Sequence, residues 1–483
     1  MSSSTYLMWF RSDLRVSDNT ALYEACSTGQ IIAVYLLFPE QWQQHDDSPN
    51  KVKFQLAQIS NLQQALNKLN IPLLIKKLNH FNEAADFLIS TAKQYQCRGL
   101  FFNEEYGVNE INRDRQVHQS FHQAQLTCQS FTDQLLFTPG TIKNQSGNFY
   151  KVFSQFKRKL YEKLAGINRL PLPTPVKQKS LNIKLVQDNL DIDFCNKAIT
   201  KLFDHWPIGE ATAQQRLQQF INHKVVDYQE NRDFPAQPAT SQLSPYLTAG
   251  MISIRQCLHA ARSANQGEFA SGNPGITCWI NELIWREFYK HILVGFPQVS
   301  KHQPFLAETQ LIPWSHDSDL LKAWQQGKTG FPIVDAAMRQ LVATGWMHNR
   351  LRMIVAMFLT KDLMLDWRLG EKFFMQHLID GDLAANNGGW QWSASTGTDA
   401  APYFRIFNPT SQSKRFDPQG QFIKAFVPEL QPIPAKYIHQ PQAYLQQNQL
   451  HQTYPEPIVD HSLAREQVLT AFKQLKEVKS CLQ

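Results

Sequence analysis

The sequence predicts an α/β N-terminal domain, with a parallel sheet in Rossmann-like layers, followed by an all-α C-terminal domain. Short β-like apolar runs alternate with segments of helical spacing in the first part of the chain, and this alternation is typical of βαβ units. Prolines and lysines dominate residues 170–184, and β-like runs largely stop beyond residue 200. We therefore expect an α/β domain over residues 1–135, a connector over residues 136–200 and a helical domain over residues 201–475.

The first domain is expected to alternate strictly between strands and helices. The expected strands are residues 5–10, 31–38, 72–75 and 99–102, and the expected helices are residues 18–27, 52–69, 83–95 and 110–124. No GxGxxG motif follows the first strand, so the sequence does not predict a Rossmann-type pyrophosphate site.

The second domain shows helical apolar spacing throughout. Helices are expected at residues 211–220, 253–264, 279–293, 319–325, 333–344, 349–365 and 371–378. Ahead of them, residues 138–166 interleave lysines and an arginine with aromatic side chains. Such a mixture can follow a phosphate backbone, and it also fits a solvated helix face beside an apolar stripe.

Composition indicates a globular protein, with 43% apolar and 18% charged residues and no apolar run of membrane-spanning length. The first residues lack the pattern of a signal peptide. The cysteines form no CxxC pair, which favours free thiols in a reducing compartment and argues against a zinc site; they are Cys26, Cys97, Cys128, Cys195, Cys257, Cys278 and Cys481. A net charge of +7 permits an anionic partner without requiring one.

Residues 380–409 (DGDLAANNGGWQWSASTGTDAAPYFRIFNP) are unusual in composition. Asn386 and Asn387 offer neutral donors and acceptors, while Trp390 and Trp392 offer rings that can stack on a planar partner. Asn-Asn-Gly-Gly is unfavourable for a core helix. The run therefore fits a wall around a large, flat ligand with polar edges; the alternative is a glycine-rich helix junction with buried tryptophans.

This run closely resembles the photolyase/cryptochrome family, together with TGFPIVDAAMRQLVATGWMHNRLRM (Thr329 to Met353) and WINELIWREFYKH (Trp279 to His291). The similarity extends from MWFRSDLRVSDNTAL near the N-terminus to YPEPIVDH near the C-terminus. Three long motifs in one order are far more specific than a lone short pattern. The chain is most similar to the class I cyclobutane pyrimidine dimer photolyases of bacterial type.

The resemblance implies light-dependent repair of cyclobutane pyrimidine dimers in DNA. The cofactor would be FAD, reduced and anionic in the active state, from which an excited electron reaches the flipped-out dimer. A cryptochrome-like flavin photoreceptor without repair activity is the alternative, and a flavin-binding DNA interaction protein without catalysis is a third candidate. Asn386 and Met353, together with the short tail after the last motif, favour repair.

By the same resemblance, FAD would contact a set of residues in the helical domain, with Arg352 pairing Asp380 and Asn386 facing the flavin N5. The implied FAD-binding residues are Tyr228, Thr240, Ser241, Gln242, Leu243, Ser244, Trp279, Arg352, Asp380, Gly381, Asp382 and Asn386. Hydroxyl groups at a helix start can hold phosphate. Relatives often have arginine where Gln242 stands, which leaves a charged contact at this position open.

The lesion pocket implied by the family has aromatic walls and hydrogen-bonding groups, with Glu282 bonding the lesion. The implied lesion and DNA contacts are Arg232, Glu282, Trp285, Arg286, Tyr289, Asn349, Arg350, Met353, Trp392 and Arg405, and Lys290 and Lys414 are further candidates for a phosphate-binding rim. The (6-4) photolyases place histidines where Asn349 and Met353 stand, so the sequence argues against (6-4) repair.

Two further groups follow from the resemblance. Trp390, Trp367 and Trp314 match the tryptophan relay that reduces the flavin in the family. These three tryptophans, Glu282 and Asn386 are the expected catalytic residues. Antenna positions are His45, Asn109, Glu110 and Lys301. Methenyltetrahydrofolate is the favoured antenna, and 8-hydroxy-5-deazaflavin is the alternative.

The expected partner is double- or single-stranded DNA that contains pyrimidine dimers, without a metal ion or a membrane. We expect a monomer in the bacterial cytosol, associated with the nucleoid.

Overall fold

The computed structural model describes residues 4–166, 170–450 and 452–482. The chain divides into two compact units, which are described separately. The first unit contains Met1–Val226, Ser241–Pro297 and Ile379–Asp382, and the second contains Asp227–Thr240, Gln298–Leu378 and Leu383–Gln483.

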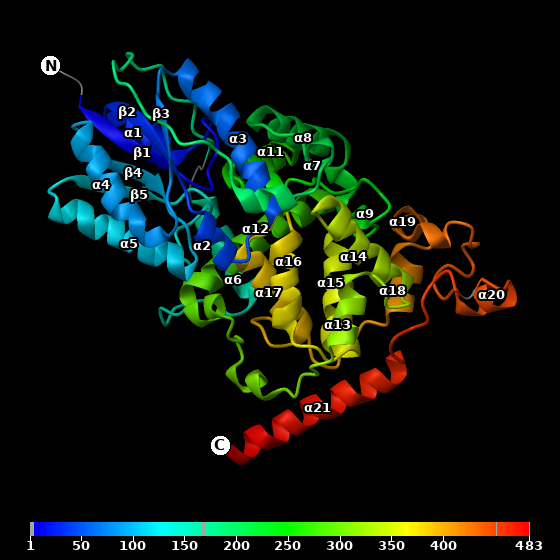
Figure 1. Ribbon diagram of the computed structural model, residues 1–483. Coiled ribbons are helices and arrows are strands. Elements are labelled where there is room, and N and C mark those ends of the chain that lie inside the picture. The colour runs from blue at the N-terminus through cyan, green and yellow to red at the C-terminus, as the bar shows by residue number, and fades with distance from the viewer. Residues whose placement is uncertain (1–3, 167–169, 451, 483) are drawn as a thin grey trace. The chain divides into compact units, whose positions relative to one another are not determined.

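A five-stranded parallel sheet forms the centre of the first unit, as the sequence predicts (Figure 1). Its strands are β1 (Thr5–Phe10), β2 (Gln30–Leu37), β3 (Leu73–Lys77), β4 (Gly99–Asn103) and β5 (Thr127–Phe131). The strand order is β3-β2-β1-β4-β5, so the order reverses between β1 and β4. In α/β sheets, ligands bind outside the carboxyl ends of the strands at such a point.

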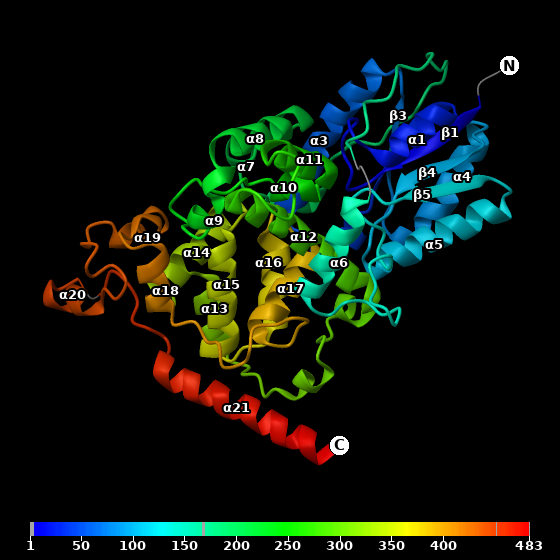
Figure 2. The ribbon, with the colours of Figure 1, turned by 180° about the vertical axis from the view of Figure 1, so that it is seen from behind.

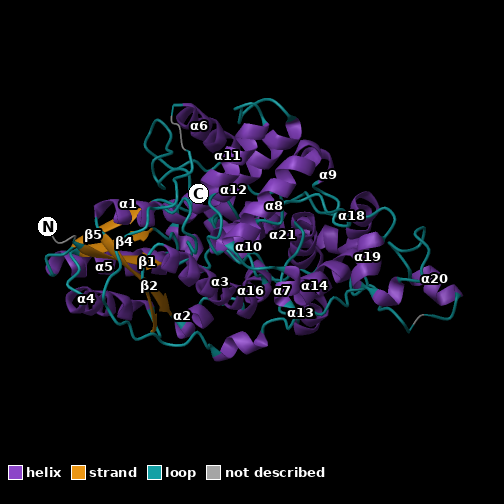
Figure 3. Ribbon diagram, turned by 90° about the horizontal axis from the view of Figure 1, so that it is seen from above, coloured by secondary structure: helices purple, strands orange, loops and turns teal. Residues whose placement is uncertain are grey.

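Helices cover both faces of this sheet (Figure 3). They include α1 (Thr20–Thr28), α3 (Pro49–Lys68), α4 (Ala84–Gln94) and α5 (Val108–Gln123). Alternate residues of β1 point to opposite faces: Met8 belongs to a buried cluster with residues of α1 and α3, and Trp9 to one with residues of α4 and α5. Burial on both faces explains why the central strands are continuous apolar runs.

Local capping accounts for several helix starts in the first unit. The Asn19 side chain accepts a hydrogen bond from the Leu22 backbone N–H at the start of α1, and Ser48 caps α3 directly before a proline. The remaining helices of this unit are α2 (Pro39–Gln44), α6 (Phe153–Ala165), α7 (Leu202–His205), α8 (Glu210–His223), α10 (Ser244–Thr248), α11 (Ile254–Ala264) and α12 (Pro274–Gly295).

A buried ion-pair network joins the segment after β1, the loop after β5 and α11 within the first unit. The Asp133 carboxylate accepts from Arg15 at 2.6 Å and from Arg255 at 2.7 Å. The Arg255 Nε also donates to the Asp18 carboxylate at 2.9 Å. Burial alone would raise the pKa of Asp133, but the two guanidinium groups hold it well below its usual range.

Apart from an isolated β-bridge between Ser315 and Leu365, the regular secondary structure in the described residues of the second unit is helical. Its helices are α9 (Tyr228–Asn231), α13 (Ser318–Gln325), α14 (Pro332–Thr344), α15 (Asn349–Met357), α16 (Trp367–His377), α17 (Leu383–Ala394), α18 (Pro409–Phe416), α19 (Gln421–Phe426), α20 (Gln442–Gln447) and α21 (His461–Leu482). Figures 1 and 2 both show α14, α15, α16 and α17 side by side. Apolar residues of these helices form its main core.

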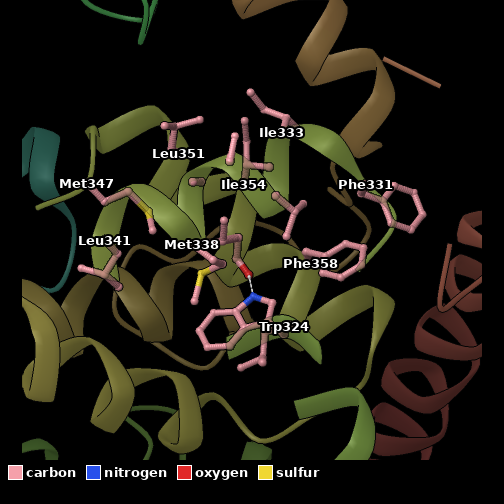
Figure 4. Packing of buried hydrophobic residues seen from close by; sticks show 14 of the residues in the cluster. Trp324, Phe331, Ile333, Met338, Leu341, Met347, Leu351, Ile354 and Phe358 are labelled. Atoms are coloured by element: carbon pink, nitrogen blue, oxygen red, sulfur yellow. Dashed lines mark hydrogen bonds between the residues drawn. The ribbon is translucent and has the colours of Figure 1, made fainter. Parts of the chain in front are cut away.

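Trp324 anchors this core (Figure 4). Its ring is fully buried near Met338 and Phe358, and its indole N–H donates to the Val355 carbonyl at 3.1 Å. A buried tryptophan needs such a partner, because an unpaired indole N–H would lose its hydrogen bond to water without replacement.

Two expectations about helices in this unit are wrong. Residues 383–394 form the helix α17, although Asn-Asn-Gly-Gly was not expected in a core helix. Residues 349–365 were expected as one helix, but α15 ends at Met357 and continues as a π-helical turn, Phe358–Asp362.

In the first unit, β5 was not predicted, because TCQSF is only partly buried and contains few apolar residues.

Candidate functional site

One face of α12 presents a carboxylate and two aromatic rings at the surface of the first unit. Glu282, Trp285 and Tyr289 are three and four residues apart, so they share this face, and all three are partly buried. The opposite face is packed in the core through Leu283, Ile284 and similar side chains. The helix predicted for residues 279–293 is therefore confirmed, and it extends over Pro274–Gly295.

Trp285 is held rigidly on this face. Its ring stacks on Phe153 of α6 with centroids 3.6 Å apart and an interplanar angle of 7°. Tyr289 lies 5.5 Å away at 30°. Because one ring face is covered by Phe153, Trp285 can offer only the other face to a flat ligand.

The polar residues around this face are fixed by buried contacts. The Arg286 guanidinium donates to the Gln134 carbonyl at 2.6 Å. The Glu287 carboxylate is fully buried and accepts from the backbone N–H groups of Leu136 and Phe137, each at 2.8 Å. Glu287, which the sequence analysis did not select, therefore fastens α12 to the segment after β5.

Lys290 is not a surface cation, in contrast to its expected place in a phosphate-binding rim. Only 6% of Lys290 is exposed, and its ammonium group lies 2.6 Å from the Asp382 carboxylate. Burial lowers the pKa of Lys290. Asp382 thus has a cationic partner, and the neighbouring Asp380 accepts a hydrogen bond from Thr248 through its backbone carbonyl at 3.4 Å.

The phosphate-binding candidates in the first unit precede α10. Ser241, Gln242 and Leu243 lead directly into this helix, which begins at Ser244. Gln242 has a positive φ of 50°, which is uncommon outside glycine. Its side-chain oxygen accepts a hydrogen bond from Arg216 of α8 at 3.2 Å.

Arg216 is a candidate functional residue that the sequence analysis missed. Its guanidinium lies 5.6 Å from the Trp206 ring centroid and 5.4 Å from that of Tyr246. These rings hold a cation beside Gln242. The contact between Arg216 and Gln242 could not be predicted from the sequence, because α8 and the segment before α10 lie far apart along the chain.

Asn386 and Asn387 lie on α17 in the second unit and point toward Glu371 of α16. The Asn386 side-chain NH₂ donates to the Glu371 carbonyl at 2.9 Å, and that of Asn387 donates to the Glu371 carboxylate at 2.8 Å. Asn386 is 9% exposed. Because its NH₂ is engaged, the amide orientation is fixed and leaves the carbonyl oxygen as the acceptor for a further donor.

The three tryptophans expected to form a relay belong to one apolar cluster of the second unit. Trp390 is 2% exposed and Trp367 is 1% exposed, while Trp314 is partly buried and packs against the same cluster. The cluster therefore runs from two enclosed indoles to one that reaches solvent.

Helices α16 and α17 approach closely where Gly370 meets the Trp390 ring. A Cβ atom added at Gly370 would lie 2.1 Å from the indole Cη2. Only glycine leaves room for the ring at this spacing.

The expected DNA-binding residues of the second unit differ in their surroundings. Arg350 is paired with Asp233 at 2.6 Å, and its guanidinium lies 4.5 Å from the Phe416 ring centroid. Arg232 lies 5.6 Å from the Tyr228 ring centroid. The others are Asn349, Met353, Trp392, Arg405 and Lys414, of which Asn349, Arg405 and Lys414 are exposed and Met353 and Trp392 are partly buried.

Three of the four expected antenna residues meet in the first unit, beyond the carboxyl ends of β2 and β4. The Asn109 side chain lies 2.8 Å from the His45 Nε2, and Glu110 lies 3.6 Å from the His45 Nδ1. Burial raises the pKa of Glu110, although the neighbouring His45 opposes this shift. Lys301 belongs to the second unit, where it is exposed.

Within the described part of the chain, no group of three or more His, Cys, Asp or Glu side chains is placed to hold a metal ion. The same residues include no helix that is long and apolar enough to span a membrane. The cysteines whose side chains are described are free thiols; Cys481 lies outside them.

Comparisons with known proteins agree with this arrangement. The family model "FAD binding domain of DNA photolyase" matches residues 279–474, and the model "DNA photolyase" matches residues 6–177. The "Deoxyribodipyrimidine photo-lyase" of Escherichia coli is 43% identical, covering 99% of this chain and 100% of the relative. The protein of the same name from Salmonella typhimurium is 44% identical, covering 98% of this chain and 99% of the relative.

Solved structures are also similar over nearly the whole chain. A bacterial class III photolyase from Agrobacterium tumefaciens is 35% identical, with a TM-score of 0.86 and coverage of 99% of this chain and 98% of its own. A cryptochrome from Synechocystis is 29% identical, with a TM-score of 0.87 and coverage of 98% and 99%.

The fold and the matched regions define a flavoprotein class in which a parallel α/β domain precedes a helical FAD-binding domain. The chain belongs to the DNA photolyase family.

Proposed function

We propose that this protein repairs cyclobutane pyrimidine dimers in DNA with light, as a deoxyribodipyrimidine photo-lyase. The observation that carries the proposal is the α12 face of Glu282, Trp285 and Tyr289, in a chain that aligns over 99% of its length with a relative of that name. Base-flipping enzymes, photolyases among them, extrude their target into a pocket and stack it on aromatic side chains. The rigid Trp285 ring and the nearby carboxylate suit that task.

The residues present fit FAD. Hydroxyl groups precede α10, and Arg216 supplies a cation beside Gln242. A buried, oriented amide is available at Asn386, and Asp382 is already neutralised by Lys290. When bound and reduced, FAD would supply the electron that light makes available to the dimer.

The roles of the protein side chains follow from their chemistry. We assign Glu282 to hydrogen bonding with the dimer and Trp285 to stacking against it. Asn386 would accept a hydrogen bond from the flavin through its carbonyl oxygen. A neutral amide here adds no charge to a cofactor whose own charge changes during the reaction.

Illumination of the reduced protein with dimer-containing DNA tests the proposal. We expect intact pyrimidines to reappear with light and not in darkness, as measured by chromatography of the digested DNA. Unchanged dimers under light, with FAD bound and reduced, would contradict repair. That result would favour a cryptochrome-like photoreceptor, the alternative that the similarity to the Synechocystis cryptochrome keeps relevant.

Replacing Arg216 by glutamine is expected to weaken FAD binding. The variant removes a cation beside the candidate diphosphate site, and hydrogen bonds to charged groups contribute about 1.5–3 kcal/mol. The dissociation constant for FAD should therefore rise roughly tenfold or more, as measured by fluorescence titration of the apoprotein.

Arg262→Gln is the matched control, since this arginine of α11 lies near Phe269 and donates to the Gly267 carbonyl. If both variants bind FAD like the wild type, Arg216 has no role at the diphosphate.

Replacing Trp314 by phenylalanine is expected to slow photoreduction of the flavin. Trp314 is the member of the tryptophan cluster that reaches solvent, and phenylalanine is far harder to oxidise than tryptophan. Absorbance under illumination with an external reductant measures the rate. Repair by chemically pre-reduced protein should be unaffected, and Trp346→Phe should behave like the wild type in both assays. Loss of repair in pre-reduced Trp314→Phe would refute a role confined to reduction.

The antenna is proposed to be methenyltetrahydrofolate, bound by His45, Asn109, Glu110 and Lys301, with 8-hydroxy-5-deazaflavin as the alternative. The absorption spectrum of the purified protein distinguishes the two chromophores.

We further propose that the protein acts as a monomer in the cytosol, near the nucleoid, on double- and single-stranded DNA. Free thiols are consistent with a reducing compartment.

A further inference from the structure

Positive charge is concentrated in one short segment of the first unit. Residues 139–166 contain six lysine or arginine residues and one glutamate, hence a net charge of +5, while the whole chain carries +7. The basic residues are Lys143, Lys151, Lys157, Arg158, Lys159 and Lys163. A segment this unbalanced creates a positive potential over its surface.

Three of these lysines lie over aromatic rings. The Lys143 ammonium is 5.3 Å from the centroid of Phe149, and that of Lys151 is 5.6 Å from the centroid of Phe296. The Lys157 ammonium lies 5.9 Å from the Phe153 ring. The rings support the aliphatic stems and hold the charged ends in place at the surface.

The segment packs directly against α12, the helix that carries the proposed lesion-stacking residue Trp285. Phe153, which supports Lys157, is the ring that stacks on Trp285 at 3.6 Å. Phe156, one turn further along α6, packs against Phe288 of α12 at 5.3 Å. The apolar stripe of α6 is thus buried against α12, and Lys151 and Arg158 are exposed.

We propose that Lys151, Lys157 and Arg158 form a second phosphate-binding surface, which holds the DNA backbone on the Trp285 side of the lesion. The proposal rests on the proposed function, because it takes DNA as the partner. Interleaved cations and aromatic rings are typical of surfaces that follow a nucleic-acid backbone. Such contacts position the DNA and do not read its sequence.

Lys159 is expected to contribute less than Lys157 and Arg158. Its ammonium group is paired with Glu162 at 2.8 Å, so part of its charge is already compensated. Lys159 is therefore a compensated lysine with which the other basic residues of α6 can be compared.

Binding at several salt concentrations tests the surface. In the variant Lys151→Gln/Lys157→Gln/Arg158→Gln, glutamine keeps a polar stem and removes the charge. Each lost phosphate contact should reduce the slope of log K against log [salt] by about 0.9, hence by roughly 2–3 for the triple variant. Affinities for dimer-containing and undamaged duplexes should fall by the same factor, which leaves their ratio unchanged.

The control is Lys68→Gln/Lys93→Gln/Arg98→Gln, which changes the net charge equally. These three residues are exposed and lie near the amino ends of β3 and β4. The control should keep the wild-type slope, and both proteins should retain the wild-type FAD content and near-ultraviolet circular dichroism.

The outcomes separate this proposal from the proposed function. If the wild type binds and repairs dimer-containing DNA but the triple variant keeps the wild-type slope, the second surface is refuted and the enzyme assignment stands. Equal losses in variant and control would also refute it, because general net charge would then explain the effect. If the wild type binds no DNA, the proposed function fails first.

Discussion

Asp133→Ala is expected to lower the free energy of unfolding by about 3–5 kcal/mol, since removing one partner leaves a buried charge uncompensated. Asp133 is 1% exposed and accepts from both Arg15 and Arg255. Without the carboxylate, the acceptors that the described residues offer Arg15 are the backbone carbonyls of Gly250 and Asp18. Urea unfolding followed by far-ultraviolet circular dichroism measures the change.

Asp188→Ala is the matched control, because its pair with Lys76 at 3.1 Å is about one-third exposed. Exposed pairs of this kind contribute roughly 0–1 kcal/mol. If the two substitutions lowered the free energy of unfolding equally, the buried network would stabilise the protein no more than an exposed ion pair.

The contribution of Asp133 should also depend on pH. Its pKa is held below the usual value in the folded state, so its stabilisation is complete above the unfolded pKa of about 3.9 and decreases as the pH falls below it. The difference in unfolding free energy between wild type and Asp133→Ala should therefore shrink on acidification below about pH 4. A constant difference down to pH 2 would contradict this assignment.

Glu282→Ala is expected to reduce repair per absorbed photon and to weaken binding of dimer-containing DNA by about tenfold or more. The carboxyl group lies on the partly buried face of α12 that also carries Trp285, and hydrogen bonds to charged groups contribute about 1.5–3 kcal/mol. FAD content should remain that of the wild type, because the substitution removes a contact to the lesion and not to the cofactor.

Two variants make this test specific. Glu282→Gln keeps a hydrogen-bonding group of similar size and should recover part of the yield. Glu268→Ala removes an exposed carboxylate elsewhere in the first unit and should change neither repair nor binding. A wild-type yield per photon in Glu282→Ala would refute a role for this residue at the lesion.

Most of the sheet and its covering helices follow from the sequence, because burial on both faces makes β1, β2 and β4 nearly continuous apolar runs. β5 lies at the edge of the sheet and is only partly buried, so its sequence carries little of this pattern. Its position depends on backbone pairing with β4, which is a tertiary contact.

The helix α17 shows how tertiary contacts override local preference. Asparagine costs up to about 0.7 kcal/mol and glycine about 1 kcal/mol relative to alanine within a helix. Here Asn386 and Asn387 both donate to Glu371 of α16. These bonds exist only once α16 and α17 are packed together, so no local pattern could reveal them.

Some candidate site residues could be predicted from local sequence spacing, whereas others depend on tertiary contacts. The spacing of Glu282 and Trp285 predicts a shared helix face, and α12 confirms that they lie on one helix. Their roles at the lesion remain predictions. Arg216 and Phe153 lie far in sequence from the residues they contact, and sequence analysis singled out neither as a site residue.

The close contact at Gly370 has a consequence for directed evolution of this protein. A library that varies position 370 would retain glycine, because even one methyl group would overlap the indole of Trp390. Any larger residue would change both the spacing of α16 and α17 and the orientation of an indole expected to carry electrons. Stability and the proposed electron transfer through Trp390 are therefore coupled at position 370.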